Sequence, residues 1–155
     1  IELSSLHLEI AESLLVENLS YAAQMLLPFR ELGVKIWMDD FGTGYSSLSY
    51  LNQLTLDGIK IDHSFVEQLA SNTNSHKTVQ MMIMLANEMD MGVIAEGIEN
   101  KDSLNLLRKL NCRYGQGFLF SQPVTAKEAE NLLLMDIQSN GLYSSFLEEI
   151  ATPVL

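Results

Sequence analysis

The chain has 155 residues, 47% of them hydrophobic, so we expect one domain with a substantial core. Its formal net charge of −11 repels phosphate backbones, which excludes DNA or RNA from the expected partners. No apolar run approaches the roughly 18 residues that cross a membrane. The chain opens on Ile1 with neither an initiator Met nor a signal-peptide pattern, which fits an internal piece of a longer protein.

Short apolar runs alternate along the chain with longer amphipathic runs. The apolar runs predict five strands, at residues 6–10, 34–38, 57–61, 93–95 and 114–119. The amphipathic runs predict helices at residues 19–32, 46–54, 76–90, 101–110 and 126–135, and the less periodic end of the chain holds one candidate helix at 142–150. Strands and helices that alternate at this spacing indicate βαβ units and a parallel sheet.

The single cysteine, Cys112, cannot form an internal disulfide. It lies between an apolar helix and an apolar strand, so we expect a half-buried structural thiol. One unpaired cysteine fits a reducing compartment. We therefore expect a cytoplasmic location, with which a membrane anchor upstream in a longer parent protein is compatible.

Polar side chains accompany the carboxyl ends of the predicted strands. In parallel α/β folds, ligand sites form at this end of the sheet, so we expect these side chains to converge. They are Glu9, Asp39, Asp40, Lys60, Glu96, Glu99 and Gln116.

Two of these carboxylates, Asp39 and Asp40, are adjacent and repel each other unless a proton or a cation intervenes. Convergence with Glu9 and Glu96 would increase the repulsion. Oxygen-rich clusters of this kind suit Mg²⁺ or Mn²⁺, so the pattern favours a metal site. The alternative is that these acids cap separate helices and face solvent.

A two-metal site would give this cluster a hydrolytic chemistry. In such a site Asp39 could bridge two ions that hold phosphate oxygens and activate a water molecule. Lys60 could orient that water or neutralise charge on the phosphoryl oxygens. Its alternative role is a structural ion pair with Asp62.

The segment 40–47, Asp-Phe-Gly-Thr-Gly-Tyr-Ser-Ser, is expected to form a loop, because its two glycines allow positive φ. No Gly-Lys-Ser/Thr follows, so a phosphate-binding P-loop is a poor interpretation. Glu12, one helical turn after Glu9, could hold this loop through backbone N–H groups or Thr43. It could also be an ordinary acid in the first turn of a helix.

Taken together, these segments resemble the C-terminal part of the EAL domain, the cyclic di-GMP phosphodiesterase module of bacterial signalling proteins. The resemblance covers roughly residues 6 to 134, with the segments in family order. The matching segments are 8–13 (Leu-Glu-Ile-Ala-Glu-Ser), 39–48 (Asp-Asp-Phe-Gly-Thr-Gly-Tyr-Ser-Ser-Leu), 59–62 (Ile-Lys-Ile-Asp), 95–99 (Ala-Glu-Gly-Ile-Glu) and 116–121 (Gln-Gly-Phe-Leu-Phe-Ser).

The resemblance implies a TIM-like (β/α)8 barrel that hydrolyses cyclic di-GMP to linear pGpG with Mg²⁺ or Mn²⁺. It implies roles for nine side chains, and it implies that the 40–47 loop contributes to dimer contacts. Glu9, Asp39, Asp40 and Glu96 would bind metal, Lys60 would position the water, Glu99 and Gln116 would support the metal–water network, and Glu12 and Thr43 would anchor the loop.

Two departures from the family pattern limit this transfer. His63 stands where the family usually has Arg. More importantly, the Glu-Ala-Leu signature, its downstream Arg and an Asn ligand would all precede Ile1. A complete barrel needs about 200 or more residues. We therefore expect residues 1–136 to form a partial barrel of about the last five strands, followed by a tail at 137–155.

A partial barrel exposes two unpaired strand edges. Its missing half could belong to the native protein, two copies could associate as a homodimer through these edges, or the fragment could rearrange into an open sheet. With a Glu and an Asn ligand absent, we expect little or no turnover from these 155 residues alone. The alternative functions are a non-catalytic cyclic di-GMP-binding or protein-interaction module, and another TIM-barrel metal hydrolase, which would leave the 40–47 run unexplained.

Overall fold

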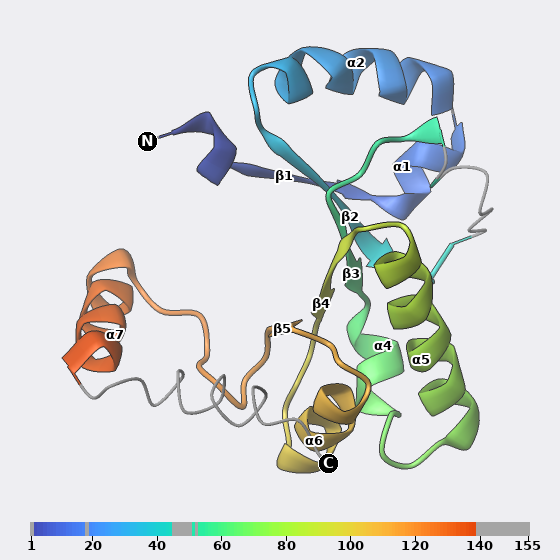
Figure 1. Cartoon of the computed structure of the whole chain (residues 1–155). Helices are drawn as coiled ribbons and strands as arrows, with labels where there is room; N and C mark the ends of the chain where they lie inside the picture. Colours follow the sequence, from blue (N-terminus) through green and yellow to red (C-terminus); the bar gives the residue numbers. More distant parts are fainter. Residues whose placement is uncertain (1, 18, 45–50, 52, 139–155) are drawn as a thin grey trace. The chain divides into compact units, whose positions relative to one another are not determined.

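The computed structural model describes residues 2–17, 19–44, 51 and 53–138 (Figure 1). The predicted helices at 46–54 and 142–150 lie mostly or wholly outside these residues. The described elements are η1 (Leu3–Ser5), β1 (His7–Ala11), α1 (Glu12–Glu17), α2 (Leu19–Glu31), β2 (Lys35–Phe41), β3 (Gly58–Ile61), α4 (His63–Glu67), α5 (Thr73–Glu88), β4 (Gly92–Ala95), α6 (Lys101–Lys109), β5 (Tyr114–Gly115) and α7 (Ala126–Gln138).

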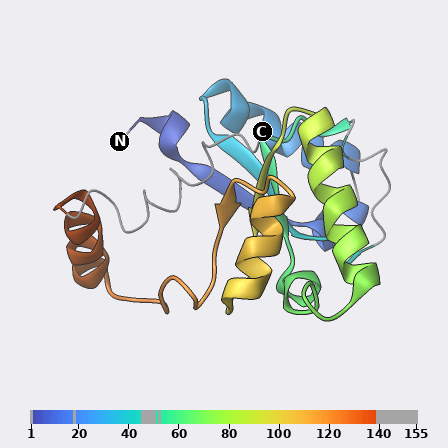
Figure 2. The same cartoon turned by 60° about the horizontal axis from the view of Figure 1, so that its bottom comes forward.

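The five strands form one sheet in the order β1-β2-β3-β4-β5, and every neighbouring pair is parallel. The predicted parallel sheet is confirmed. Because the strands run the same way, all of their carboxyl ends lie at one edge of the sheet. Helix α1 contacts β1 and β2, α2 contacts β2, and α5 runs beside β3 and β4 (Figures 1 and 2).

The central strands are apolar because both of their faces are covered, as parallel strands generally require. All four residues of β3 are buried, including Lys60. The sheet packs mainly through side chains that are at most 9% exposed, and these include Ile36, Met38, Ile59, Ile61, Val93 and Ala95. Lys60 is therefore buried within a sheet that packs through apolar side chains.

Polar caps define where the helices begin. The Asn72 side chain accepts hydrogen bonds from two backbone N–H groups at the start of α5, and the Asn100 side chain accepts one from Ser103 at the start of α6. Gly33, at φ +86°, follows α2 in the left-handed conformation that commonly ends a helix. The sequence indicated this stop correctly.

The structure differs from the predicted elements in three places. The short helices α1 and α4 were not predicted, since six and five residues are too few to show a helical period. Strand β2 extends to Phe41, so Asp39 and Asp40 lie inside it rather than after it. The predicted strand at 114–119 is only Tyr114–Gly115, because the chain turns at Gly117.

Trp37 fills the space below the polar end of the sheet. A Cβ atom on Gly58 or Gly92 would come within 2.4 or 2.6 Å of its indole ring, so both β3 and β4 need glycine at that level. The His7 ring stacks on the indole, with ring centroids 5.4 Å apart. His7 is therefore a packing residue.

The chain divides into two compact units, Ile1–Phe120 and Ser121–Leu155. In the second, α7 begins with a capping box in which the Thr125 N–H donates to Glu128 and the Glu128 N–H donates to Thr125. The predicted division after residue 136 stays a prediction. Among the described residues, no helix is both long and apolar enough to cross a membrane.

Candidate metal centre

A local irregularity in β2 brings Asp39 and Asp40 together. In a regular strand, successive side chains point to opposite faces of the sheet. Here the pairing with β3 shifts register between Met38 and Phe41, and Asp40 takes φ +54°. A bulge of this kind re-aims a side chain, and Asp tolerates positive φ better than most residues. Both carboxylates can therefore face the same centre.

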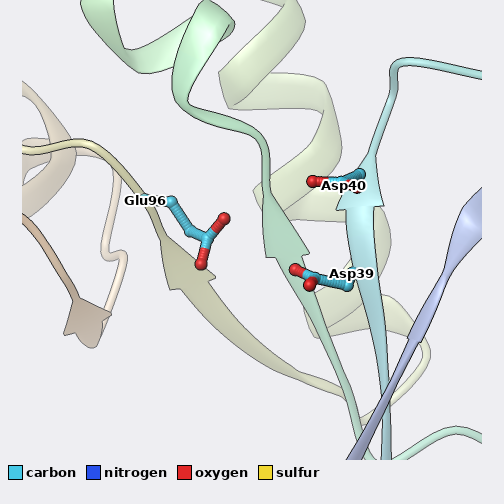
Figure 3. A group of neighbouring side chains, drawn as sticks. All are labelled: Asp39, Asp40 and Glu96. Carbon is cyan, nitrogen blue, oxygen red and sulfur yellow. The ribbon is translucent and has the colours of Figure 1, made fainter.

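Glu96 meets this pair from the end of β4. Carboxylate oxygens of Asp39, Asp40 and Glu96 all lie within 4.8 Å of one another. Figure 3 shows Asp39 and Asp40 projecting from β2 towards Glu96 across the end of β3. The predicted convergence of these three residues is what the structure shows.

Lys60, on the intervening strand β3, is the cation at this centre. Its Nζ lies 2.7 Å from Glu96 Oε1, 2.9 Å from Glu9 Oε2 and 3.2 Å from Asp39 Oδ1. The residue is only 6% exposed. Glu9 does not belong to the three-carboxylate group, so its link to that group runs through Lys60.

Burial acts to lower the pKa of Lys60, but its contacts with the carboxylates of Glu96, Glu9 and Asp39 outweigh it and hold the pKa above its ordinary value. Lys60 is therefore an ammonium ion at neutral pH. The alternative pairing with Asp62 is wrong, because Asp62 binds His63 Nδ1 at 3.0 Å and caps α4 through the Ser64 N–H. Burial acts to raise the pKa of Asp62, but hydrogen bonds from the Ser64 hydroxyl and N–H, together with His63, outweigh it and hold the pKa below its ordinary value.

Glu12 anchors the loop that follows β2. This residue is 1% exposed, and its carboxylate accepts hydrogen bonds from the backbone N–H groups of Gly42 at 2.8 Å and Gly44 at 3.3 Å. Thr43 takes another route, since its Oγ1 donates to the Asp40 carbonyl at 2.9 Å. Glu12 thus contacts the loop through backbone N–H groups, one of the two arrangements that the sequence left open.

Glu99 and Gln116 lie near the same end of the sheet but are exposed, and neither belongs to the carboxylate group. The backbone of Ile98 holds their segments together: its N–H donates to the Gln116 carbonyl and its carbonyl accepts from the Leu119 N–H. A Cβ atom on Gly117 would lie 2.2 Å from the Ile98 oxygen.

The sequence did not lead us to predict these contacts between the backbone of Ile98 and the segment 116–119, which we call the clasp between Ile98 and Gly117. The available signal was the glycine that follows Gln116, since a glycine inside a strand pattern marks a close backbone approach. Gly97, at φ +69°, packs in the same way against His63.

The donors of this centre suit a hard divalent cation. Asp39, Asp40 and Glu96 offer only carboxylate oxygens, the ligand type that Mg²⁺ and Mn²⁺ prefer. Asp39 Oδ1 is buried and has no hydrogen-bond partner among the described residues, and the Lys60 ammonium lies 3.2 Å from it. A metal ion at this oxygen would displace no hydrogen bond but would share the oxygen with Lys60.

Comparison with known proteins places this geometry in a family. Residues 1–123 match the family model of the EAL domain, so the chain belongs to the EAL domain family. A cyclic di-GMP phosphodiesterase of Pseudomonas aeruginosa is 43% identical over 133 residues, which make up 86% of this chain and 23% of that protein.

Two solved structures extend the comparison. The PaMucR phosphodiesterase in complex with cyclic di-GMP superposes with a TM-score of 0.80 at 35% identity, covering 83% of this chain and 52% of that one. Klebsiella pneumoniae BlrP1 with manganese and cyclic di-GMP gives a TM-score of 0.75 at 29% identity, covering 79% and 31%. EAL domains form TIM-like barrels, so the five parallel strands are part of such a barrel, as predicted.

Proposed function

We propose that this chain supplies the metal-binding half of a cyclic di-GMP phosphodiesterase site. The observation that carries the proposal is the convergence of Asp39, Asp40 and Glu96 within 4.8 Å at the carboxyl end of the sheet. Relatives that carry the same family domain are named as cyclic di-GMP phosphodiesterases. The complete site would hydrolyse cyclic di-GMP to linear pGpG.

In this proposal Asp39, Asp40, Glu96 and Glu9 would hold two divalent cations, Mg²⁺ or Mn²⁺. Once bound, these ions supply Lewis-acid activation of the phosphate and lower the pKa of a water molecule. The chain's own contribution is to fix the carboxylates, through the β2 bulge and the Glu12-anchored loop. Preorganisation of this kind matters because small misplacements in a metal centre are costly.

The remaining residues act on the water and the phosphate. Lys60, with three N–H donors, would donate to the attacking water or to a phosphoryl oxygen on which charge develops. Glu99 and Gln116 would accept from and donate to the same water network. Attack on phosphorus breaks one P–O ester bond, and the released sugar oxygen takes up a proton to give the linear dinucleotide.

The 155 residues by themselves would have little or no turnover, because the Glu-Ala-Leu glutamate and an asparagine ligand are not among them. Strands β1 and β5 each have one neighbour in the sheet, so their outer edges can pair with further strands. We propose that a second copy, or the upstream part of a longer chain, covers these edges. A cytoplasmic location stays a prediction.

Calorimetric titration separates binding from catalysis. Cyclic di-GMP is titrated into the chain with Ca²⁺, and pGpG formation is then followed by chromatography with Mn²⁺. Binding without steady turnover supports the incomplete site, and Asp39→Asn should remove the binding. Steady hydrolysis by the chain alone would show that the site is complete. Ligand binding by a complete barrel that still fails to cleave would favour the non-catalytic module.

The oligomeric state is measured independently of ligand binding. Light scattering coupled to size-exclusion chromatography gives the mass of the chain in solution. A mass twice that of one chain supports association through the edges. A compact monomer with cooperative thermal unfolding would contradict it.

A further inference from the structure

The contacts of Lys60 give it a role beyond orienting water. Its ammonium reaches carboxylates from three separate segments: Glu9 on β1, Asp39 on β2 and Glu96 directly after β4. All three distances, from 2.7 to 3.2 Å, are those of direct ion pairs. The Lys60 side chain is almost fully buried, whereas the Glu9 side chain is 45% exposed, so water screens the contacts with Glu96 and Asp39 less than the contact with Glu9.

We propose that Lys60 is a built-in counter-ion that competes with divalent metal for the carboxylates of the site. The inference rests on the proposed metal-binding function and deepens it. Metal that binds Glu9, Asp39 and Glu96 must share these oxygens with the Lys60 ammonium or displace it from at least one of them.

The balance of charges at this site explains why such a counter-ion is useful. Glu9, Asp39, Asp40 and Glu96 carry four negative charges, and Lys60 is the cation that contacts three of them. Like charges this close destabilise a fold unless a cation offsets them. Lysine suits this task better than arginine, because its compact ammonium has three donors that can point at three separate acceptors.

The same balance of charges predicts that Lys60 weakens the affinity of the site for metal. A metal ion at these carboxylates experiences the positive charge of Lys60 at short range and little screening. Each carboxylate has about four lone-pair sites, so an oxygen can serve Lys60 while its partner oxygen serves the metal. The competition is therefore partial, and removal of the ammonium should strengthen metal binding about tenfold, within the usual range of coupling between two ligands.

A lysine that only orients water makes the opposite prediction. Its removal would leave metal affinity unchanged, or weaken it if Lys60 helps to hold the ligands in place. The sign of the change in affinity therefore separates the two roles, and it can be read without measuring any turnover.

The experiment compares Mn²⁺ binding to the full chain and to Lys60→Met by isothermal titration calorimetry. The matched control is Lys35→Met, which removes another lysine paired to a carboxylate, at the far end of β2. We expect Lys60→Met to bind Mn²⁺ about tenfold more tightly than the unsubstituted chain. Lys35→Met should bind as the unsubstituted chain does.

Thermal unfolding gives a second readout. Without metal, Lys60→Met should melt below the unsubstituted chain, since its carboxylates lose their counter-ion. With Mn²⁺ it should gain more in Tm than the unsubstituted chain gains, because tighter binding stabilises the folded state more. Should Lys60→Met fail to fold, Lys60→Gln keeps a hydrogen-bond donor, removes the same charge and should show the same gain in affinity.

Three results would overturn the inference. Equal or weaker Mn²⁺ binding by Lys60→Met and Lys60→Gln would show that Lys60 does not compete, while binding by the unsubstituted chain would leave the metal site standing. A gain in affinity of the same size in Lys35→Met would assign the effect to net charge. Absence of Mn²⁺ binding in every variant would remove the metal site and the inference together.

Discussion

The two ends of the sheet each hold a lysine among carboxylates, and they do so in opposite ways. At the amino end, Lys35 pairs with one carboxylate, Asp57, at 2.8 Å. Asp57 also accepts the Ile36 N–H at 2.9 Å, so its two oxygens both have partners. At the carboxyl end, the single ammonium of Lys60 serves three carboxylates, and Asp39 Oδ1 lacks a hydrogen bond among the described residues.

This difference separates a structural ion pair from a candidate site. The amino-end pair is balanced, and its hydrogen bonds join the starts of β2 and β3. The carboxyl-end group has an excess of negative charge that a further cation or a proton would offset. An unbalanced cluster is costly to keep, which indicates that it serves binding rather than stability.

The largest expected effect comes from the same substitution made at each end. Asp39→Asn should weaken Mn²⁺ binding by at least about a hundredfold, more than the loss of an outer partner usually costs. It should change the free energy of unfolding little, because it removes a charge from a repelling group. Asp57→Asn should leave Mn²⁺ binding unchanged and lower stability by about 1 kcal/mol, since it disrupts the exposed Lys35 ion pair and a partly buried hydrogen bond.

Calorimetry with Mn²⁺ and urea unfolding without metal measure the two effects on both variants. If Asp57→Asn impairs metal binding as strongly as Asp39→Asn does, the metal site is not confined to the carboxyl end. If Asp39→Asn destabilises the metal-free chain as much as Asp57→Asn does, the carboxyl-end group is as structural as the amino-end pair.

A smaller effect should follow from loosening the loop that leads away from Asp40. Glu12→Ala leaves the N–H groups of Gly42 and Gly44 without their acceptor, at a cost of about 1–3 kcal/mol in stability. We expect Mn²⁺ affinity to fall about tenfold, the lower end of the range for outer-shell changes.

Glu12→Gln is the matched control, because it keeps an amide oxygen that can accept the same two hydrogen bonds. It should lose less than half of the stability and affinity that Glu12→Ala loses. Equal losses in both variants would show that the negative charge, and not the hydrogen bonds to the loop, is what matters at this position.

The sequence predicted which residues gather at the carboxyl end but not how they do so. The apolar runs defined five strands, and parallel pairing then placed Asp39, Lys60 and Glu96 at one edge. The bulge that turns Asp40 to φ +54° has no sequence signature of its own, because it depends on pairing with β3. The sequence could not identify the partners of Lys60 for the same reason, since one of them, Glu9, is 51 residues away.

The clasp between Ile98 and Gly117 was also missed, although Gly117 itself was a signal of close backbone approach. It shortens β5 to two residues by turning the chain over the segment that follows β4. An apolar run cannot show such a turn, since the turn depends on a backbone contact between segments about twenty residues apart. The roles expected for Glu99 and Gln116 at this turn stay predictions.

Acid should act on the amino end through Asp57. Burial tends to raise the pKa of this carboxyl, but the hydrogen bonds from Lys35 and Ile36 outweigh it and hold the pKa below the ordinary value of 3.8. A lowered pKa in the folded state gives stability that is present above pH 3.8 and is lost as the pH falls through the folded pKa.

Urea midpoints measured from pH 7 down to pH 3 test this contribution. The stability of Asp57→Asn should fall less steeply below about pH 4 than that of the unsubstituted chain, since the variant has no such carboxyl to protonate. Parallel curves for the two proteins would show that the Lys35–Asp57 pair contributes nothing to acid stability.

The smallest expected effect on the fold concerns Cys112, which lies between α6 and β5. Its Sγ is 3.4 Å from the Tyr114 carbonyl, and burial raises the pKa of the thiol from 9.0 to about 11. The thiol is more buried than the half-buried state that the sequence suggested, at 8% exposure. Only the thiolate is alkylated, so at pH 8 its population should be about a hundredfold lower in the folded chain than in the unfolded chain.

Iodoacetamide labelling at pH 8, followed by mass spectrometry, should therefore be at least about a hundredfold slower without urea than with it. Mn²⁺ should not change the rate, because the contacts of the Cys112 thiol are with backbone carbonyls of Val93 and Tyr114 and not with the carboxylates of the candidate metal centre. Rapid labelling of the folded chain would show that the packing of β5 against β4 opens readily. A rate that depends on Mn²⁺ would show that metal binding at the carboxylates tightens or loosens this packing.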